Sequence, residues 1–489
     1  MVSASDFLRI GASVYFVGIK GTGVCALVEL MHAKGVAISG SDIGEVFYTD
    51  AILQGLGISY HECFDPAHIT DSIDVVIHSA AYSIENNVEL AEASRKSIPI
   101  VPYPTALGLY SAAFDSTSIA GVHGKTTTTA MCGCLMRSLD LPAQILAGSA
   151  VANFDGKSVL VQGDTYFIAE TCEYRSHFLA FHPKRVVLTA VESDHQDYFP
   201  TYESIRDAFV EYCRRIPPGG ELIYCADDPG ASEVADIIAK DACGISLVPY
   251  GFSAEGDFRV SGYCVEHDSA RFSINAFPRE IRLHVPGRHQ VLNAAAAIAL
   301  SSILLKKEFA DNKTKDAIWN DCRQLFVTNA LGEFKGSKRR SELIGNANGI
   351  LFMDDYGHHP TAIKTTLEGL KDFFPSRRLV VSFMSHTYTR TAALLDEFAR
   401  SLAVADVLFL HKIYASARER FDGNVSGMSI FEKVRSLGSC EVHYVEEPLD
   451  AFMPLTQELK QGDLFLTLGA GNNWPLGLQL FEHFSKVSA

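Results

Sequence analysis

A short glycine-containing segment in the first third of the chain has the residue types of a phosphate-binding loop. Residues 120–129 read AGVHGKTTTT and directly follow an apolar run that is typical of a strand. Glycines allow a tight turn in which successive backbone N–H groups point at phosphate oxygens. In such a loop Lys125 would neutralise the terminal phosphates, and the Thr126 hydroxyl would bind Mg²⁺. The spacing GxxGKT is shorter than the usual GxxxxGK[ST], so a plain strand-to-helix turn stays the alternative.

Two acidic segments follow the next two predicted strands, ETCE at 170–173 and ESDHQD at 192–197. The carboxyl ends of parallel strands meet at one edge of a sheet, where ligands gather. We therefore expect Glu170 and His195 to converge near Thr126 as metal ligands or ligand-positioning groups. Either segment alone would also suit a solvated surface loop, but their occurrence at successive strand ends favours a site.

A second glycine-rich turn lies near the start of the chain. Residues 18–23 read GIKGTG and follow an apolar run at 14–17, while Asp42 lies at the end of the next predicted strand. The order GxxGxG differs from the GxGxxG of dinucleotide-binding folds, so the residues predict a pyrophosphate-binding loop for an unspecified nucleotide. Asp42 is placed where it could meet a ribose. A plain tight turn is the alternative.

Cationic and histidine residues gather around two predicted strand ends in the last third of the chain. The run KRR at 338–340 precedes a strand that ends in MDDYGHHP at 353–360, and a further strand ends in SHTYTR at 385–390. Such groups suit a carboxylate or phosphate ligand. Alternatively, the histidine pair packs against or caps the helix that begins near Pro360.

Short apolar runs alternate with amphipathic segments along the whole chain, which is typical of α/β domains with parallel sheets. Residues 260–277 alternate like a small antiparallel excursion, and residues 293–305 form an alanine-rich helix. We expect three α/β domains in series, at 1–113, 114–328 and 329–489. The predicted strands are 14–17, 36–39, 75–78, 117–120, 166–169, 185–189, 221–225, 350–353, 379–383, 407–410, 442–445 and 464–468.

The composition excludes several classes of function. The 489 residues are 47% hydrophobic and 20% charged, which is ordinary for a globular protein. The formal charge of −16 repels nucleic-acid backbones, so no nucleic-acid partner is expected. Residues 1–10 lack a basic segment followed by an apolar stretch, and no run of 18 apolar residues occurs. We therefore expect no signal peptide, no membrane partner and a cytoplasmic location.

Taken in order, these motifs resemble those of the Mur ligases of peptidoglycan synthesis over nearly the whole chain. That family has a phosphate loop of this shape, then ExxE, ExDHxD, PGxHxxxN, RRxE and DDYGHHP segments. The matching segments here are 121–129, 170–173, 192–197, 286–293, 339–342 and 354–360. One such motif would be weak evidence, whereas all of them in order are specific.

The resemblance implies a Rossmann-like N-terminal domain for a UDP-sugar, a central P-loop domain for ATP with Mg²⁺, and a Rossmann-like C-terminal domain for the amino acid. The catalytic residues that it implies are Lys125, Glu170, His195 and Arg340, and the metal ligands are Thr126, Glu170 and His195. The implied ATP-binding residues are Gly121, His123, Gly124, Lys125, Thr126, Thr127, His289, Asn293, Arg340 and Asp355. The implied UDP-sugar-binding residues are Gly18, Gly21, Thr22, Gly23, Ser41, Asp42 and Ser79. The implied amino-acid-binding residues are Tyr356, His359, His386 and Arg390.

The implied reaction is ATP-dependent amide-bond formation through an acyl phosphate. Residues 386–391, HTYTRT, look like the segment of members that add L-alanine to UDP-N-acetylmuramate, and this is the favoured activity. Residues 335–345 and 358–370 also resemble the member that recycles a whole tripeptide, which is the alternative. The chain departs from the usual family residues at Ala190, Gln290, Thr387, Asn472 and the pair Tyr103-Pro104. These departures concern uridine or substrate contacts rather than the core of the ATP site.

Two classes outside the ligases stay open on the residues alone. An NAD-dependent oxidoreductase would use residues 18–23 with Asp42, but it leaves residues 121–129 unexplained. A nucleotide-binding module without catalysis would release no phosphate with any amino acid. For a ligase of this type we expect a monomer or a weak homodimer.

Overall fold

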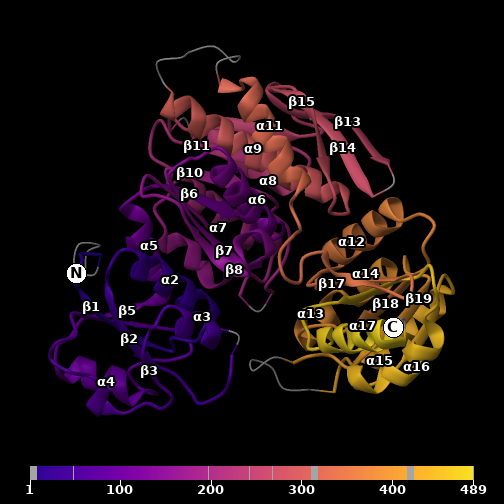
Figure 1. Cartoon of the computed structure of the whole chain (residues 1–489), viewed down its shortest axis with the longest axis horizontal. Coiled ribbons are helices and arrows are strands. Elements are labelled where there is room, and N and C mark those ends of the chain that lie inside the picture. Colours follow the sequence, from indigo (N-terminus) through magenta and orange to yellow (C-terminus); the bar gives the residue numbers. More distant parts are fainter. Residues whose placement is uncertain are drawn as a thin grey trace. The chain divides into compact units, whose positions relative to one another are not determined.

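The computed structural model describes residues 8–47, 49–196, 198–241, 243–266, 268–309, 318–415 and 423–487. These residues form two compact units. The first unit takes its described residues from 1–191, 206–250 and 296–313. The second takes them from 192–205, 251–295 and 314–489. Three mostly parallel sheets run through the fold, as the alternating sequence pattern predicts (Figure 1).

The N-terminal part of the first unit is a five-stranded parallel sheet in the order β3-β2-β1-β4-β5. Its strands are β1 (Ser13–Val17), β2 (Ala37–Ser41), β3 (Tyr60–His61), β4 (Val75–His78) and β5 (Ile100–Pro102). Its helices are α2 (Thr22–Ala33), α3 (Thr49–Gly55), α4 (Val88–Arg95) and α5 (Tyr103–Ala112). β1 lies between β2 and β4, so the chain order reverses beside it, and the loop after β1 opens at the crevice where α/β folds bind ligands.

The remaining sheet of the first unit has the order β12-β11-β10-β6-β9-β7-β8. Its strands are β6 (Asp115–Ala120), β7 (Ala143–Val151), β8 (Lys157–Val161), β9 (Tyr166–Glu170), β10 (Arg185–Leu188), β11 (Glu221–Cys225) and β12 (Ser246–Gly251). The helices along this stretch are α6 (Lys125–Ser138), α7 (Tyr202–Cys213) and α8 (Pro229–Lys240). All neighbouring pairs are parallel except β7 with β8. β6 is central, so the loop that follows it is flanked by the ends of β9 and β10.

The predicted antiparallel excursion is confirmed and is larger than expected. It consists of β13 (Phe258–Glu266), β14 (Ser269–Ile274) and β15 (Phe277–Leu283), which pair antiparallel in the second unit. The alanine-rich helix is α9 (Arg288–Glu308), followed by α11 (Asp321–Gly332). Among the described residues, α9 alone is long and apolar enough to span a membrane, and 78% of its most apolar window is buried in the protein. That burial is typical of a core helix.

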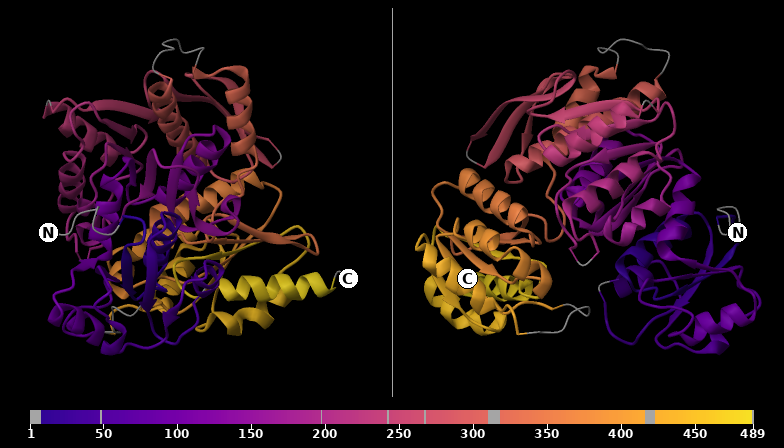
Figure 2. Two further views of the ribbon diagram at one scale, coloured as in Figure 1. Left: turned by 60° about the vertical axis from the view of Figure 1, so that its left-hand side comes forward. Right: turned by 180° about the vertical axis from the view of Figure 1, so that it is seen from behind.

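The C-terminal sheet has the order β16-β17-β21-β18-β19-β20, with only β16 antiparallel. Its strands are β16 (Glu342–Ala347), β17 (Ile350–Asp355), β18 (Leu379–Phe383), β19 (Val407–Leu410), β20 (Glu441–Tyr444) and β21 (Leu464–Leu468). Its helices are α12 (Pro360–Phe373), α13 (Tyr388–Ala393), α14 (Leu395–Leu402), α15 (Gly427–Leu437), α16 (Phe452–Glu458) and α17 (Trp474–Val487). Alternate strand residues pack against α12, α14 and α15 on one face and against α16 and α17 on the other. The ribbon views show helices on both sides of this sheet (Figure 2). This two-sided burial explains the continuous apolar runs of the central strands.

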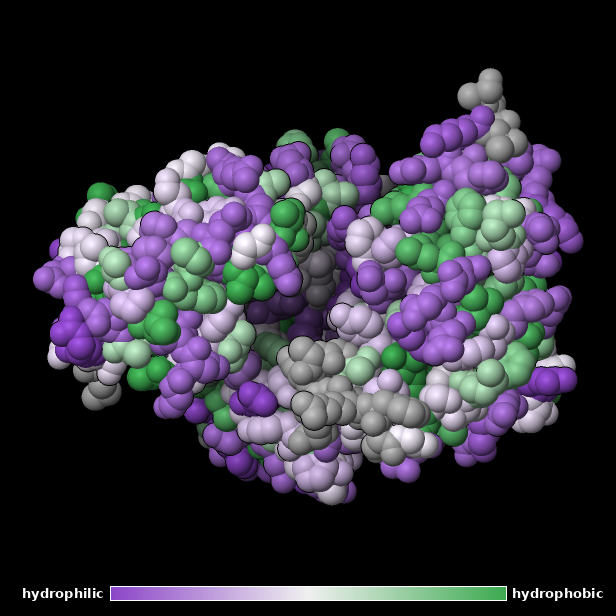
Figure 3. All heavy atoms as spheres, turned by 90° about the horizontal axis from the view of Figure 1, so that it is seen from below, coloured by the Kyte–Doolittle hydropathy of each residue, from purple (hydrophilic) through white to green (hydrophobic). Residues whose placement is uncertain are grey.

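The viewed surface agrees with the mixed polar and apolar composition. Figure 3 shows hydrophilic and hydrophobic residues interspersed over the viewed face. Scattered exposed apolar residues of this kind are normal for a globular protein and mark no site by themselves.

Candidate active site

The first glycine-rich turn is held by backbone contacts at the ends of three parallel strands. The amides of Gly18 and Ile19 donate to the Ser41 carbonyl at the end of β2, at 2.8 and 3.1 Å. Gly18 has φ +81°, and a Cβ there would lie 2.9 Å from Ser79 Cβ, just after β4. Only glycine suits that conformation and that close approach. The structure therefore brings the predicted UDP-sugar residues Gly18, Gly21, Thr22, Gly23, Ser41, Asp42 and Ser79 to one edge of the first sheet.

Asp42 fixes the shape of this turn. One carboxylate oxygen accepts the Lys20 amide at 2.7 Å, and the other accepts the Ile43 amide at 2.8 Å. The Lys20 ammonium is buried and pairs with Asp50 and Glu62, each at 3.0 Å. Burial disfavours that charge, but the two carboxylates raise the pKa of Lys20. The carboxylate of Asp42 thus holds the loop, and its contact with a ribose stays a prediction.

A buried carboxylate that the sequence did not single out supports Ser41. Glu89 on α4 is fully buried and accepts hydrogen bonds from the hydroxyls of Ser41 and Tyr15. The His68 ring lies 2.7 Å from the same carboxylate. In the sequence, Glu89 is an acidic residue in the first turn of a helix. Such residues are usually exposed to solvent, so the sequence pattern did not predict that this one is buried.

The phosphate-type loop joins β6 to α6 in the first unit, as predicted. Gly124 has φ +80°, and a Cβ on Gly121 (φ +134°) would lie 2.2 Å from the Thr189 hydroxyl at the end of β10. The Val122 amide donates to the Ala190 carbonyl at 2.9 Å, and the Thr189 hydroxyl donates to the His123 carbonyl. Ala190 therefore supports the loop through its backbone, which does not require the asparagine usual in the family.

Lys125 lies over its own loop and against an acidic strand end. Its ammonium donates to Glu173 at 2.8 Å and to the Gly121 carbonyl. Burial disfavours the ammonium form, but neighbouring acidic groups, Glu173 foremost and Glu170 with it, together outweigh burial and raise the pKa of Lys125. The lysine therefore stays charged at neutral pH, as a phosphate ligand requires. Thr126, the second residue of α6, is also buried.

Glu170 ends β9 beside this loop with an unsatisfied carboxylate oxygen. Its Oε2 is buried and makes no hydrogen bond to any described residue. Its Oε1 packs closely on Gly148, because a Cβ built on Gly148 would lie 1.6 Å from that oxygen. An orphaned carboxylate oxygen is a costly arrangement unless something binds it. A hard cation such as Mg²⁺ takes carboxylate oxygen, so the residue fits the predicted metal role.

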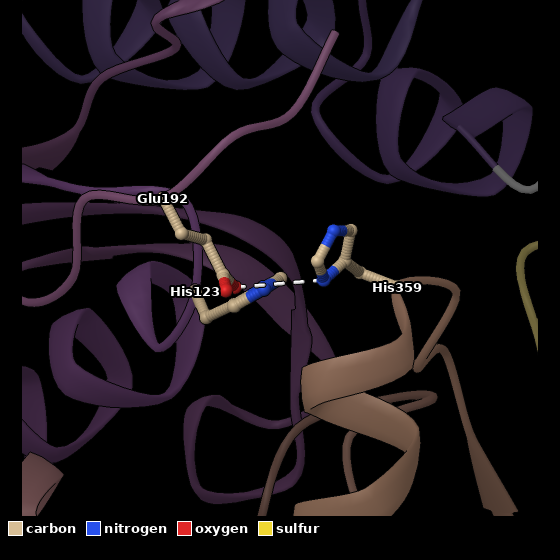
Figure 4. A group of neighbouring side chains, drawn as sticks. All are labelled: His123, Glu192 and His359. Atoms are coloured by element: carbon tan, nitrogen blue, oxygen red, sulfur yellow. Dashed lines mark ion pairs between the residues drawn. The ribbon is translucent and has the colours of Figure 1, made fainter. Parts of the chain in front are cut away.

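In the second unit, the segment that contains His195 contacts the predicted amino-acid pocket. Asp194 accepts two hydrogen bonds from the Arg390 guanidinium and a third from the His195 amide. Glu192 lies 3.6 Å from the His359 ring (Figure 4). Its carboxylate also accepts the Thr361 hydroxyl at 2.9 Å. His195 belongs to this unit and Glu170 to the first, so their convergence stays a prediction. Asp197, the last residue of that motif, lies outside the described residues.

Two arginines flank the Tyr356 ring at the end of β17. The guanidinium carbons of Arg339 and Arg340 lie 5.1 and 4.9 Å from the ring centre. Arg339 is also bound to Asp354 and to the Gly469 carbonyl, at 3.0 and 2.7 Å. The Arg340 guanidinium makes no hydrogen bond to the described residues, so its donors are available to a phosphate.

Asp355, also at the end of β17, binds the backbone around it. Its carboxylate accepts the amides of Ser341 and Gly357, both at 2.7 Å. The Ser341 hydroxyl contacts it as well, at 3.3 Å. This aspartate therefore shapes the loop between Arg340 and β16, and its contact with a ribose stays a prediction.

A cluster of aromatic rings includes the predicted pocket residue His386. The ring of His386, just after β18, lies 6.3 Å from that of His358 and 5.9 Å from that of Tyr414. Burial and the neighbouring Arg390 charge hold the pKa of His358 well below its ordinary value. His358 is thus a neutral imidazole. Sequence reasoning gave this residue no role, although the histidine pair itself was noticed.

The predicted adenine-binding residues lie at the start of α9. Gly287 has φ +110°, and a Cβ there would meet the His289 ring. Gly369 of α12 lies against Gly287, because a Cβ built on Gly369 would lie 2.7 Å from the Gly287 Cα. The Asn293 amide donates to Gln290 at 3.1 Å. The glutamine that departs from the family pattern is therefore a partner of Asn293.

Comparison with known proteins agrees with the order of these motifs. Models for the Mur ligase family catalytic domain, the Mur ligase middle domain and the Mur ligase glutamate ligase domain match residues 13–115, 119–301 and 339–471. The UDP-N-acetylmuramate–L-alanine ligase of Treponema pallidum (strain Nichols) is 51% identical, over 97% of each chain. The chain belongs to the Mur ligase family.

A further relative and two solved structures are also similar to the chain. The UDP-N-acetylmuramate–L-alanine ligase of Borreliella burgdorferi is 36% identical, over 95% of this chain and 97% of its own. The crystal structure of the Thermotoga maritima UDP-N-acetylmuramate–alanine ligase covers 97% of this chain and 99% of its own, with a TM-score of 0.74 and 24% identity. A murein peptide ligase from Psychrobacter arcticus gives a TM-score of 0.64 over 98% of this chain and all of its own, at 23% identity. These two structures establish the shared three-domain Mur ligase fold.

Proposed function

We propose that this protein is an ATP-dependent ligase that joins L-alanine to UDP-N-acetylmuramate in peptidoglycan precursor synthesis. The observation that carries the proposal is the 51% identity, over nearly the full length of both chains, to a ligase of that name. Membership of the Mur ligase family rules out the oxidoreductase alternative. The tripeptide-recycling alternative rests on structures at 23% and 22% identity, which support the fold alone.

The proposed chemistry follows from the weakness of a carboxylate as an acyl donor. The lactyl carboxylate attacks the γ-phosphorus of ATP, which forms an acyl phosphate and releases ADP. The amine of alanine then attacks the acyl carbon, and the tetrahedral intermediate expels phosphate as the amide forms. In this scheme Lys125 binds the transferred phosphoryl group, and Arg340 offers it a second cation.

We assign Mg²⁺ to Thr126, Glu170 and His195, where the metal would neutralise phosphate charge. The support is the buried, orphaned Oε2 of Glu170 and the buried Thr126 next to Lys125. His289 and Asn293 are assigned to the adenine, and Asp355 to ATP. Tyr356, His359, His386 and Arg390 are assigned to the amino acid. The domain boundaries 1–113, 114–328 and 329–489, the cytoplasmic location and a monomer or weak homodimer complete the proposal.

The substrate requirement is tested by phosphate release from ATP and Mg²⁺. We expect release that needs both UDP-N-acetylmuramate and L-alanine, because the acyl phosphate forms on the first and is consumed by the second. Other amino acids and the tripeptide L-Ala-γ-D-Glu-meso-diaminopimelate are the comparison substrates. Release with the tripeptide alone would make the protein a recycling ligase. No release with any amine would contradict the ligase assignment.

The metal role is tested by Glu170→Gln, which keeps the shape and removes the charge. We expect the Mg²⁺ concentration for half-maximal activity to rise by about tenfold or more, because affinity depends on ligand charge. Glu221→Gln is the control, since Glu221 begins β11 at the opposite edge of the same sheet and pairs with Arg185. Equal Mg²⁺ dependence in the two variants would remove Glu170 from the metal site.

A further inference from the structure

Asp194 and Arg390 form a buried ion pair with an asymmetric geometry. The two residues are only 3% and 6% exposed. One carboxylate oxygen, Oδ1, accepts Nε at 3.1 Å and Nη2 at 2.7 Å. The other terminal nitrogen, Nη1, is buried and makes no hydrogen bond to any described residue. The aspartate thus occupies one edge of the guanidinium, and the edge that carries Nη1 is left open.

The unpaired Nη1 destabilises the protein unless a ligand accepts a hydrogen bond from it. A buried donor without a partner is destabilising, and more so when it is charged. The two hydrogen bonds from Nε and Nη2 to the same carboxylate oxygen hold the guanidinium in one orientation.

The surroundings indicate what the open edge can bind. Among the predicted amino-acid-binding residues Tyr356, His359, His386 and Arg390, the arginine is the one whose side chain is always a cation at neutral pH. A planar guanidinium edge matches a carboxylate better than a point charge does. An amino acid carries such a group next to the amine that must react.

We propose that Asp194 is a positioning residue, which orients Arg390 so that Nη1 receives the carboxylate of the incoming amino acid. Asp194 also accepts the His195 amide at 2.7 Å, where His195 has φ +53°. The same carboxylate therefore ties the amino-acid pocket to the segment that carries the proposed metal ligand. This inference rests on the proposed function.

The test compares L-alanine with L-alaninamide, which has the reacting amine but no carboxylate. Asp194→Asn keeps an oxygen for the His195 amide but weakens the hold on Arg390. We expect its kcat/KM for alanine to fall by about tenfold more than its kcat/KM for alaninamide, with the KM for ATP nearly unchanged. A loss of general structure would lower both values equally, and equal losses would overturn the proposal.

Asp463→Asn is the matched control. Asp463 is a buried aspartate in the same unit that pairs with Arg378 at 2.8 Å, and it directly precedes β21, so it lies at the edge opposite the site. This control should leave the alanine-to-alaninamide ratio unchanged. If Asp194→Asn does not fold, Asp194→Glu keeps the charge but displaces it, and it should lower the same ratio. A wild-type protein that does not use alanine would refute the proposed function, whereas an unchanged ratio in an active variant refutes only the positioning role.

Discussion

Lys125→Ala is expected to lower kcat by about 10³-fold or more, because one cation on the transferred phosphoryl group has an effect of that size. Binding of UDP-N-acetylmuramate should be unchanged, since its proposed loop follows β1 in another sheet. Phosphate release measures the first quantity, and calorimetric titration of the UDP-sugar measures the second. Lys184→Ala removes an exposed lysine of the same unit and should be neutral.

The partner of Lys125 complicates the reading of that variant. Lys125→Ala leaves the buried Glu173 carboxylate without its ion pair, and breaking a buried pair costs about 3–5 kcal/mol. The double variant Lys125→Ala/Glu173→Gln removes the stranded charge and should regain stability but not activity. Near-normal turnover in a folded Lys125→Ala protein would contradict the phosphate-loop assignment.

Arg390→Lys is expected to raise the KM for L-alanine by about 10²-fold, because lysine keeps a charge beside Asp194 but cannot offer two edges at once. The KM values for ATP and the UDP-sugar should change far less. Steady-state kinetics with each substrate varied in turn measures the three constants. Arg378→Lys is the control, since Arg378 makes a similar double contact with Asp463 away from the site.

The outcome separates a binding role from a structural one. An unchanged KM for alanine would remove Arg390 from the amino-acid pocket. Equal increases in all three KM values would mean that the Asp194–Arg390 pair stabilises the protein without contacting alanine. The same reasoning explains why lysine is preferred to alanine at this position, because alanine would leave Asp194 buried and unpaired.

Local sequence predicted the central strands closely, because each is a short apolar run buried on two faces. Residues 75–78, 221–225, 379–383, 407–410 and 464–468 are strands with the expected bounds. Several strands were missed, among them β12 and β16. β12 contains Pro249, and β16, at the edge of its sheet, contains Gly345. Both residue types weaken a strand pattern.

Several features of this protein were determined by the sequence alone. The order of the glycines and the lysine in residues 121–125 predicted the loop between β6 and α6. The positive φ angles of Gly121 and Gly124 are a local property of the backbone, so the local sequence determines them. The acids and histidines at strand ends were recognised because strand periodicity is also local. The order of all these motifs was sufficient to identify the family.

Only the tertiary structure decided which of those groups meet. Lys125 and Glu173 are 48 residues apart, and Asp194 and Arg390 are 196 apart. The first contact exists because β9 pairs with β6, and the second because the segment after β10 packs against α13. Strand order and such packing arise from summed burial over many residues, and no single segment encodes them. That is why the sequence identified the charged groups, while their pairing emerged only from the fold.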